Sequence, residues 1–413
     1  MIRIYPTQFQ GHIKAPASKA HAQRLLFASA LTNTATLIKN VPECDDIDTT
    51  LQCLLDFGCT VEKHGETEIK IFPFVKTNPV PSAEFDFRQS GTTAHLAIPL
   101  AAAFGIRADC RASGTLVKRP LISLSSRMAL RGVKFSSFNL PLSMSGMLQP
   151  GEYVFPGNEG SQYISGALMA LPILRDDSII RLSSPLVDGT FIDVTLDTME
   201  DFGIRVDVDE EGFHIPGRQF YKSPGKTVVE NDWGLGAMWA CAGCLSRDEE
   251  NPVIVDDLPA RTVQMYRSFK NVMSLLRYDV KYLNVDASET PNLACLYAII
   301  AASKGSGMDI TGVPQLRFKE TNRLKAVSEC IRALGATAHA TDDGIHIEER
   351  EHFDYPEDVK LDCKGDPWIF MSLALAAGCL PKPILLDDEH CAEKVYRHFL
   401  RDYRSLGGKY EIL

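Results

Sequence analysis

Six times along the chain, an amphipathic run ends at a glycine or an aspartate, and a short stretch of alternating apolar and polar residues follows. The residues at that position are Gly58, Gly132, Gly203, Asp279, Gly335 and Gly407. Glycine there is typical of a left-handed residue that ends a helix, and aspartate tolerates the same conformation. The repeat predicts six βαβαββ units with two helices each, too long for a solenoid.

Grouping the six units three and three predicts an α/β protein with two similar domains. A chain of 413 residues suits this number, since a domain usually has roughly 100 to 200 residues. We expect one domain to comprise residues 16–225 and the other residues 1–15 plus 226–413, with the active cleft between them.

Turn signals set the expected border. Pro216-Gly217 and Pro224-Gly225 precede an apolar helix that begins near Trp233, so the chain should cross near residue 226. The short strand Ile2 to Tyr5 fits the second domain, which places the first crossing at Ala15-Pro16.

Composition excludes several classes of partner. The chain carries 43 basic and 53 acidic residues, a formal charge of −10, and this charge disfavours nucleic acid. Its longest apolar runs, Ile164 to Leu174 and Leu293 to Ala302, are about half the ~20 residues that span a bilayer. We therefore expect no membrane association. We also expect the protein to be a monomer.

The 11 cysteines are scattered among apolar residues, which predicts reduced core thiols in the cytoplasm rather than a disulfide framework. The start of the chain also lacks the pattern of a secretory signal. Cys241 and Cys244 have no second pair and no nearby histidine, so we expect them to pack in the core rather than to bind a metal.

Cations and hydrogen-bonding residues collect at the starts of expected helices, where free backbone N–H groups attract anions. Ser18 is a good N-cap, and Lys19 and Arg24 follow it closely enough to reach one anionic ligand. The ordinary alternative is a capped helix with two solvated cations.

Three further helix starts have the same character. Gly91 lies in a Ser-Gly-Thr-Thr turn, Arg119 precedes Pro120, and Ser161 with Gln162 is expected to cap a buried helix. Such turns form phosphate or carboxylate cradles, although plain helix starts look alike.

The segment from residue 317 to 323 is the most informative. It places Arg317, Lys319, Glu320 and Arg323 ahead of an amphipathic helix, and Lys394 is expected at a later helix start. If the helix starts of both domains face one cleft, these cations bind small, multiply charged anions. Glu320 among them can act as a base or, once protonated, as an acid.

In this order the motifs resemble those of the enolpyruvyl transferases, and among them the 5-enolpyruvylshikimate-3-phosphate synthases. The resemblance covers nearly the whole chain, and its most specific element is the KETxRL signature at residues 319–324. The other matching residues are Ser18-Lys19, Arg24, Gly91-Thr92, Lys118-Arg119-Pro120, Ser161-Gln162 and Lys394.

The resemblance implies an inside-out α/β barrel in each domain, and it implies neither a metal nor an organic cofactor. It also implies transfer of the enolpyruvyl group from phosphoenolpyruvate to a hydroxyl of shikimate 3-phosphate, in the pathway to aromatic amino acids. The implied roles are phosphoenolpyruvate binding by Arg119, Arg323 and Lys394, contact with both substrates by Lys19, acceptor binding by Arg24, Ser161, Gln162 and Lys319, and proton transfer by Glu320.

Several positions depart from the family pattern. Asn292 replaces the catalytic aspartate and Asp188 replaces the serine that contacts the acceptor phosphate. An Asp-His-Arg triplet reads Asp366-Pro367-Trp368, so one cation is missing. Ala20, Gly160 and Phe191 also differ from the family's residues.

These departures leave two alternatives. One is an enolpyruvyl transferase that acts on a different hydroxyl acceptor, whether phosphorylated or unphosphorylated, and the other is an anion-binding protein without turnover. A UDP-N-acetylglucosamine enolpyruvyl transferase is disfavoured because no cysteine lies in the loop before Arg119. The acidic charge and residues 319–323 argue against an RNA 3′-phosphate cyclase, and no Gly-x-Gly-x-x-Gly motif supports a dehydrogenase.

Overall fold

The structure is a computed structural model that describes residues 1–74, 80–245, 252–264, 268–277, 280–351 and 354–413. The chain forms two compact units. Unit 1 comprises Met1–Pro16 and Asn231–Leu413, and unit 2 comprises Ala17–Glu230. The second border therefore lies beyond the one expected at residue 226.

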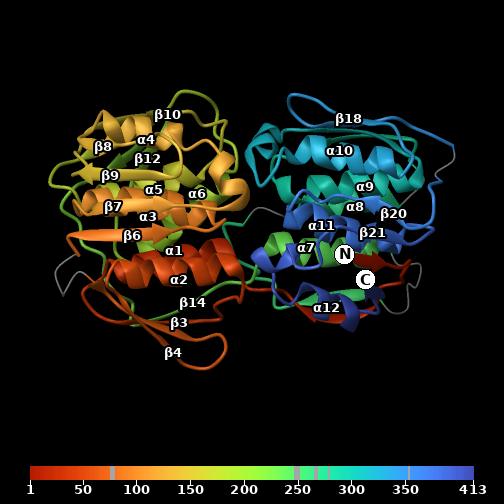
Figure 1. Ribbon diagram of the computed structural model, residues 1–413, viewed down its shortest axis with the longest axis horizontal. Coiled ribbons are helices and arrows are strands. Elements are labelled where there is room, and N and C mark those ends of the chain that lie inside the picture. Colours follow the sequence, from red (N-terminus) through yellow and green to blue (C-terminus); the bar gives the residue numbers. More distant parts are fainter. Residues whose placement is uncertain (75–79, 246–251, 265–267, 278–279, 352–353) are drawn as a thin grey trace. The chain divides into compact units, whose positions relative to one another are not determined.

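Unit 2 alternates short strands with helices, as the repeat predicts (Figure 1). Its helices are α1 (Lys19–Ala30), α2 (Asp45–Asp56), α3 (Gly91–Ala103), α4 (Ile122–Ala129), α5 (Gln162–Ala170) and α6 (Gly189–Asp201), with the 3₁₀ helices η2 (Gly114–Lys118) and η3 (Leu171–Ile173). Its strands are β3 (Thr36–Lys39), β4 (Thr60–Lys63), β5 (Ile69–Phe72), β6 (Ser82–Asp86), β7 (Arg107–Arg111), β8 (Val133–Phe135), β9 (Leu142–Gly146), β10 (Glu152–Phe155), β11 (Ser178–Leu182), β12 (Asp207–Asp209), β13 (Gly212–Ile215) and β14 (Lys226–Val228).

Unit 1 repeats this alternation. Its helices are α7 (Trp233–Leu245), α8 (Phe269–Arg277), α9 (Ala294–Lys304), α10 (Arg323–Ala333), α11 (Pro367–Leu375) and α12 (Phe399–Ser405), with η4 (Pro291–Leu293), η5 (Pro314–Phe318), η6 (Ala376–Gly378) and η7 (Cys391–Lys394). Its strands are β1 (Ile2–Ile4), β2 (Gly11–Lys14), β15 (Val253–Asp256), β16 (Tyr282–Asp286), β17 (Gly307–Thr311), β18 (Ala338–Ala340), β19 (Ile345–Ile347), β20 (Val359–Leu361), β21 (Ile384–Leu386) and β22 (Tyr410–Ile412).

Five of the sheets share one topology, in which a parallel pair is followed by two antiparallel strands. In the order β6-β7-β9-β8, for example, β6 is parallel to β7, while β9 is antiparallel to both β7 and β8. The sixth sheet, in the described residues, is the parallel pair β15-β2. A parallel pair needs a helical crossover between its strands, which explains the recurring helix.

Strands from distant parts of the sequence complete three sheets. β14 lies next to β3 in unit 2, and β2 lies next to β15 in unit 1. β1 is inserted between β21 and β22, so the two ends of the chain lie side by side (Figure 1). The pairing of β14 with β3 explains why the border falls after Glu230 rather than near residue 226.

The left-handed helix ends are confirmed at five of the six repeat positions. Gly58, Gly132, Gly203, Gly335 and Gly407 all have φ between 76° and 96°. The sixth position, Asp279, lies outside the described residues.

Helices occupy the interior of each unit and strands the outside. In α3 and α9 nearly every residue is buried, as expected for helices that are apolar on all sides. Strands such as β7 and β16 alternate buried and exposed residues, so only one face packs on the core. Within the described ranges, every helix is too short or too polar to cross a bilayer.

Candidate functional site

Unit 1 gathers charged residues around Arg323, the first residue of α10. Its Nε donates to Asp366 Oδ2 at 2.8 Å, its Nη1 to Asn292 Oδ1 at 3.0 Å and its Nη2 to Glu320 Oε2 at 3.0 Å. Lys394 Nζ donates to the other Glu320 oxygen at 2.8 Å. We call these five residues the Glu320 cluster.

Helix ends position the members of this cluster. Asn322 caps α10 by accepting from the backbone N–H of Lys325 at 3.1 Å, which fixes the start at Arg323. Asp366 caps α11 by accepting from the backbone N–H groups of Trp368 and Ile369. These caps therefore fix the helix starts at which Arg323 and Asp366 lie.

Lys394 is not at a helix start, contrary to expectation. It is the last residue of η7, a single 3₁₀ turn. Its side chain is 9% exposed, so the folded chain rather than a free helix terminus determines its environment.

Burial and charge act in opposite directions in this cluster. Burial alone would lower the pKa of Arg323, but the carboxylates of Asp366 and Glu320 raise it above its ordinary value. Burial raises the pKa of Asp366, and Arg323 opposes that effect. Arg323 is thus a permanent cation inside the unit.

Asn292 lies in a short 3₁₀ segment, and Lys319 directly follows another. Asn292 belongs to η4, and its amide oxygen accepts from Arg323. An amide cannot take up a proton as a carboxylate can. Lys319 follows η5 in extended conformation and is partly buried.

In unit 2, Lys19 forms an ion pair with Asp46. The distance from Lys19 Nζ to Asp46 Oδ2 is 2.7 Å, and the Asp46 side chain is only 6% exposed. Ser18 caps α1 as predicted, accepting from the backbone N–H of His21. The buried carboxylate of Asp46 in the first turn of α2 thereby positions the ammonium group.

Arg24 is buried without an acidic residue among its hydrogen-bond acceptors in the described part of the chain. Its guanidinium donates to Thr195 Oγ1 at 2.6 Å, Ser165 Oγ at 3.1 Å and the carbonyls of Ala20 and Phe191. Burial lowers the pKa of Arg24 to about 10, which leaves it charged at neutral pH.

Gly91, Arg119 and Gln162 converge at the start of α3. A Cβ atom at Gly91 would lie 2.9 Å from Arg119 Nη1 and 3.4 Å from Gln162 Oε1. Gln162 also donates to Thr92 Oγ1 at 3.0 Å. The lack of a side chain at residue 91 therefore lets a guanidinium and an amide approach the N-terminus of the helix.

Ser161 and Asp188 precede helices α5 and α6. Ser161 makes no side-chain capping bond, contrary to expectation, and its buried Oγ has no hydrogen-bond partner among the described residues. Asp188 adopts a left-handed conformation with φ of 56° and is 6% exposed.

The structure thus brings the predicted residues into groups within each unit. Glu320, Asn292, Arg323 and Lys394 share one cluster in unit 1, and Gly91, Arg119 and Gln162 meet in unit 2. Sequence reasoning missed the ion pair of Lys19 with Asp46 and the contacts of Arg24 with Ser165 and Thr195. A serine within an otherwise apolar helix was the available signal for Ser165.

No set of three histidine, cysteine or acidic side chains in the described residues is arranged to hold a metal ion. The cysteines are free, and Cys241 is buried in the core of unit 1. Burial raises the pKa of both Cys241 and Cys244, which keeps these thiols protonated.

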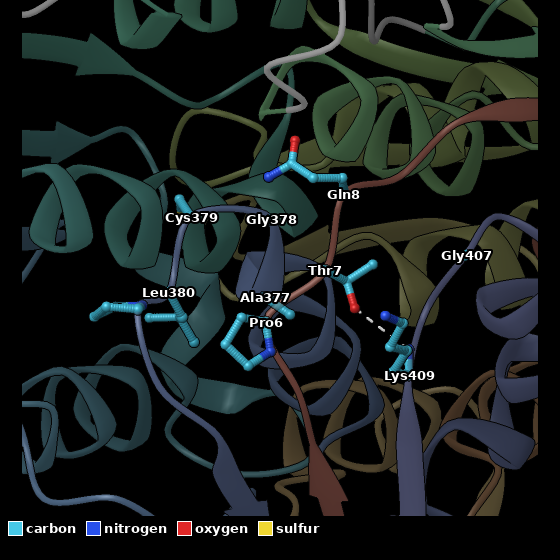
Figure 2. A pocket seen from close by; sticks show the side chains of 10 residues that line it. Pro6, Thr7, Gln8, Ala377, Gly378, Cys379, Leu380, Gly407 and Lys409 are labelled. Atoms are coloured by element: carbon cyan, nitrogen blue, oxygen red, sulfur yellow. Dashed lines mark hydrogen bonds between the residues drawn. The ribbon is translucent and has the colours of Figure 1, made fainter.

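One cavity of about 490 Å³ lies elsewhere in unit 1 (Figure 2). It is lined by the segment after β1, the loop after η6 and the turn before β22, including Thr7, Cys379 and Lys409. None of the predicted site residues lines it. We therefore do not assign the candidate chemistry to this cavity.

The comparisons with known proteins agree with one another. The sequence model of EPSP synthase (3-phosphoshikimate 1-carboxyvinyltransferase) matches residues 5–403. The 3-phosphoshikimate 1-carboxyvinyltransferase of Clostridioides difficile is 29% identical over 434 residues, covering 99% of this chain and 98% of that protein. The enzyme of the same name from Clostridium perfringens strain 13 is 31% identical over 432 residues, with 98% of each covered.

A solved structure of EPSP synthase from Acinetobacter baumannii superposes with a TM-score of 0.78 at 18% identity. The superposition covers 100% of this chain and 99% of the other. This similarity confirms the predicted fold class of two α/β domains built from βαβαββ units.

Proposed function

The chain belongs to the EPSP synthase family, and on this premise we propose that it transfers the enolpyruvyl group of phosphoenolpyruvate to a hydroxyl of shikimate 3-phosphate. This reaction belongs to the pathway of aromatic amino-acid biosynthesis. The observation that carries the proposal is the Glu320 carboxylate, held between Lys394 Nζ and Arg323 Nη2.

The reaction needs a proton at the methylene carbon of phosphoenolpyruvate while the acceptor oxygen bonds to the neighbouring carbon. Protonated Glu320 supplies it and so becomes a carboxylate. In the second step the C–O bond to phosphate breaks, and Glu320 takes a proton back from the new methyl group. One carboxyl group therefore serves both steps.

Cations bind the substrate anions in this proposal. Arg119, Arg323 and Lys394 are the phosphoenolpyruvate ligands, as in the family pattern. Lys19 contacts both substrates, and Asp46 orients its ammonium group. The acceptor-binding residues are Arg24, Ser161, Gln162 and Lys319, with Gly91 leaving room for ligand atoms.

Because residue 292 is an asparagine, no carboxylate at this position takes up the proton of the acceptor hydroxyl. Its amide oxygen accepts from Arg323 and cannot accept a proton. The acceptor hydroxyl proton therefore passes to solvent or to the departing phosphate, and Asn292 only helps to orient Arg323.

A second candidate acceptor is favoured by Asp188. A buried carboxylate at the start of α6 repels a phosphate, so an unphosphorylated hydroxyl acceptor suits this position better. The donor chemistry at Glu320 is the same in both cases.

The test is to incubate the full chain with phosphoenolpyruvate and shikimate 3-phosphate, and to measure phosphate and the enolpyruvyl ether. We expect both products only when donor and acceptor are present together. Phosphate release with shikimate but not with shikimate 3-phosphate would support the second acceptor. Absence of release with either acceptor would contradict the transferase proposal and favour anion binding without turnover.

We also propose a cytoplasmic monomer. The supporting observations are the net charge of −10 and the buried free cysteines. Size-exclusion chromatography with light scattering tests the oligomeric state, and a dimer mass would contradict it.

A further inference from the structure

Two histidines lie opposite each other on the solvent side of a sheet in unit 1. β18 and β19 form a hairpin in which His339 is directly paired with His346. The two ring centres are 4.8 Å apart, and the ring planes form an angle of 40°. The neighbouring residues Ala338 and Ile347 are buried, so the alternation of each strand directs both imidazoles away from the core.

The turn of the hairpin fixes this pairing. The backbone N–H of Thr341 donates to the carbonyl of Gly344 at 2.9 Å, and the backbone N–H of Gly344 donates to Thr341 Oγ1 at 2.8 Å. Side chains that are directly paired across two antiparallel strands start from Cβ atoms about 4.5–5.5 Å apart. The backbone therefore brings the two imidazoles together without the help of a ligand.

Asp309 of β17 orients the ring of His346. His346 Nδ1 lies 2.6 Å from Asp309 Oδ1, and the hydroxyl of Tyr282 donates to Asp309 Oδ2 at 2.8 Å. These two hydrogen bonds lower the pKa of Asp309, which is therefore a carboxylate at neutral pH. Because a carboxylate only accepts, Nδ1 of the neutral ring carries the proton and Nε2 carries the lone pair.

The nitrogen with the lone pair is open to solvent. Within the described ranges, neither His346 Nε2 nor the ring nitrogens of His339 form a hydrogen bond with the protein. The His346 side chain is 28% exposed, and His339 is exposed. A carboxylate behind an imidazole whose other nitrogen is open is the arrangement that orients histidine ligands of metals.

The spacing of the rings matches that of two imidazoles on one metal ion. A metal bound about 2.1 Å from a histidine nitrogen lies about 3.2 Å from the centre of that ring. With an angle of about 90–110° at the metal, the centres of two such rings are about 4.5–5.2 Å apart. The separation of 4.8 Å between His339 and His346 lies within this range.

We propose that His339 and His346 together bind one divalent transition-metal ion, such as Zn²⁺ or Ni²⁺, on the surface of unit 1. Imidazole suits these ions, whereas Mg²⁺ and Ca²⁺ prefer oxygen ligands. Water fills the remaining positions, because the described residues provide no set of three histidine, cysteine or acidic ligands. Asp309 is a positioning residue that acts through His346. The site is separate from the transfer reaction, since neither histidine belongs to the Glu320 cluster.

Calorimetric titration of the untagged, metal-free full chain with Ni²⁺ tests this site. We expect saturable binding of about one ion per chain, and no such binding of Mg²⁺. His339→Gln and His346→Gln should each weaken binding about tenfold or more, because the second nitrogen of a pair binds without a separate association. Asp309→Asn should weaken binding about tenfold, although it leaves both ligands in place.

His12→Gln is the matched control. His12 also lies on a strand of unit 1, and its Nδ1 is 3.1 Å from Asp256 Oδ2, but the residue paired with it is Ile254 rather than a second histidine. This variant should bind Ni²⁺ as tightly as the natural chain.

Nuclear magnetic resonance of the chain with ¹⁵N-labelled histidine gives a second measurement. The chain has 10 histidines, and saturating Zn²⁺ should shift the ring signals of His339 and His346 far more than those of the others. The His346 signals should show a metal at Nε2 and a proton retained at Nδ1. Asp309→Asn should reduce the share of this tautomer, a change that a purely structural role of Asp309 would not produce.

Three results would overturn the inference. The first is the absence of saturable Ni²⁺ binding to the natural chain. The second is binding that keeps its affinity in His339→Gln or in His346→Gln, because the ion would then lie elsewhere. The third is an equal loss of affinity in His12→Gln, which would show binding to single surface histidines.

Discussion

At the scale of single residues, Glu320 carries the chemistry that the account requires. Its carboxylate contacts Lys394 and Arg323, and no other charged member of the cluster is as exposed. Replacement by glutamine keeps the size and hydrogen-bonding ability but removes the transferable proton. We expect Glu320→Gln to lower kcat by about 10²-fold or more while phosphoenolpyruvate still binds.

Steady-state kinetics with both substrates, together with a direct binding measurement, checks this prediction. Glu348→Gln is the matched control, because Glu348 is exposed and outside the cluster, and it should retain the natural rate. Full activity of Glu320→Gln would show that this carboxyl group transfers no proton.

The sequence allowed the members of the cluster to be identified, but not their partners. Residues 319–323 indicate Glu320 and Arg323 as candidates, because charged residues gathered ahead of an amphipathic helix are typical of an anion-binding site. Their contacts with Asp366 and Lys394 depend on three separate segments that meet only in the folded unit. Local pattern contains no information about such distant pairings.

At the scale of elements, the close approach of α5 to α3 is the tightest feature of unit 2. A Cβ atom at Gly166 would lie 1.9 Å from the backbone oxygen of His95. We expect Gly166→Ala to lower the free energy of unfolding by about 1–3 kcal/mol or more, because the helices must separate. Urea denaturation measures the change.

Gly189→Ala is the control for that substitution. Gly189 is the first residue of α6, and its added Cβ would meet only Leu186 Cδ2 at 3.7 Å. This variant should be neutral or stabilised by about 0.4–1 kcal/mol through its less flexible unfolded state. Equal losses in both variants would contradict the close-approach argument.

A hydrogen bond links α1 to the segment after β14, and it predicts that the free energy of unfolding depends on pH. His21 Nδ1 accepts from the backbone N–H of Glu230 at 3.1 Å, which requires a neutral ring. Burial lowers the pKa of His21 to about 4, below its ordinary value of about 6.5. A depressed pKa stabilises the fold above pH 6.5, and this contribution is lost as pH falls toward 4.

We therefore expect His21 to account for a loss of about 2 kcal/mol in unfolding free energy between pH 7 and pH 5. Denaturation of the natural chain and of His21→Gln at both pH values measures it. The variant should show the smaller difference. His95, whose pKa burial also lowers to about 4, should leave a residual dependence in the variant. An identical difference in the two proteins would refute the assignment.

Helix ends could be predicted from the sequence because their causes are local. Glycine at the left-handed positions and Ser18 at the N-cap both act within a few residues. The environment of Lys394 could not be predicted from the sequence, because η7 is a short 3₁₀ turn whose form depends on packing.

At the scale of the whole molecule, the pairing of strands that are distant in sequence determines where the chain can be divided. β14 follows the expected border at residue 225 but pairs with β3 of unit 2. Without β14, β3 still pairs with β5 but becomes an edge strand of the sheet. We expect residues 17–230 to unfold cooperatively as an isolated domain and residues 17–225 to be less stable and prone to aggregation.

Thermal unfolding followed by circular dichroism, with light scattering, distinguishes the two fragments. Equal stability would show that β14 contributes little to unit 2. The repeat predicted the six βαβαββ modules, and residues 1–15, which include β2, were expected in the second domain. The pairing of β14 with β3 was not predicted, because β14 follows the expected border and its pattern alone fits either domain.

The central claim is that Glu320 adds a proton to the donor's methylene carbon and later removes one. Running the reaction in D₂O and measuring the mass of the enolpyruvyl ether tests this most directly. A transient methyl group carries one deuteron, so part of the product should retain deuterium in its vinyl group. Product free of deuterium after many turnovers of the natural chain would contradict the account.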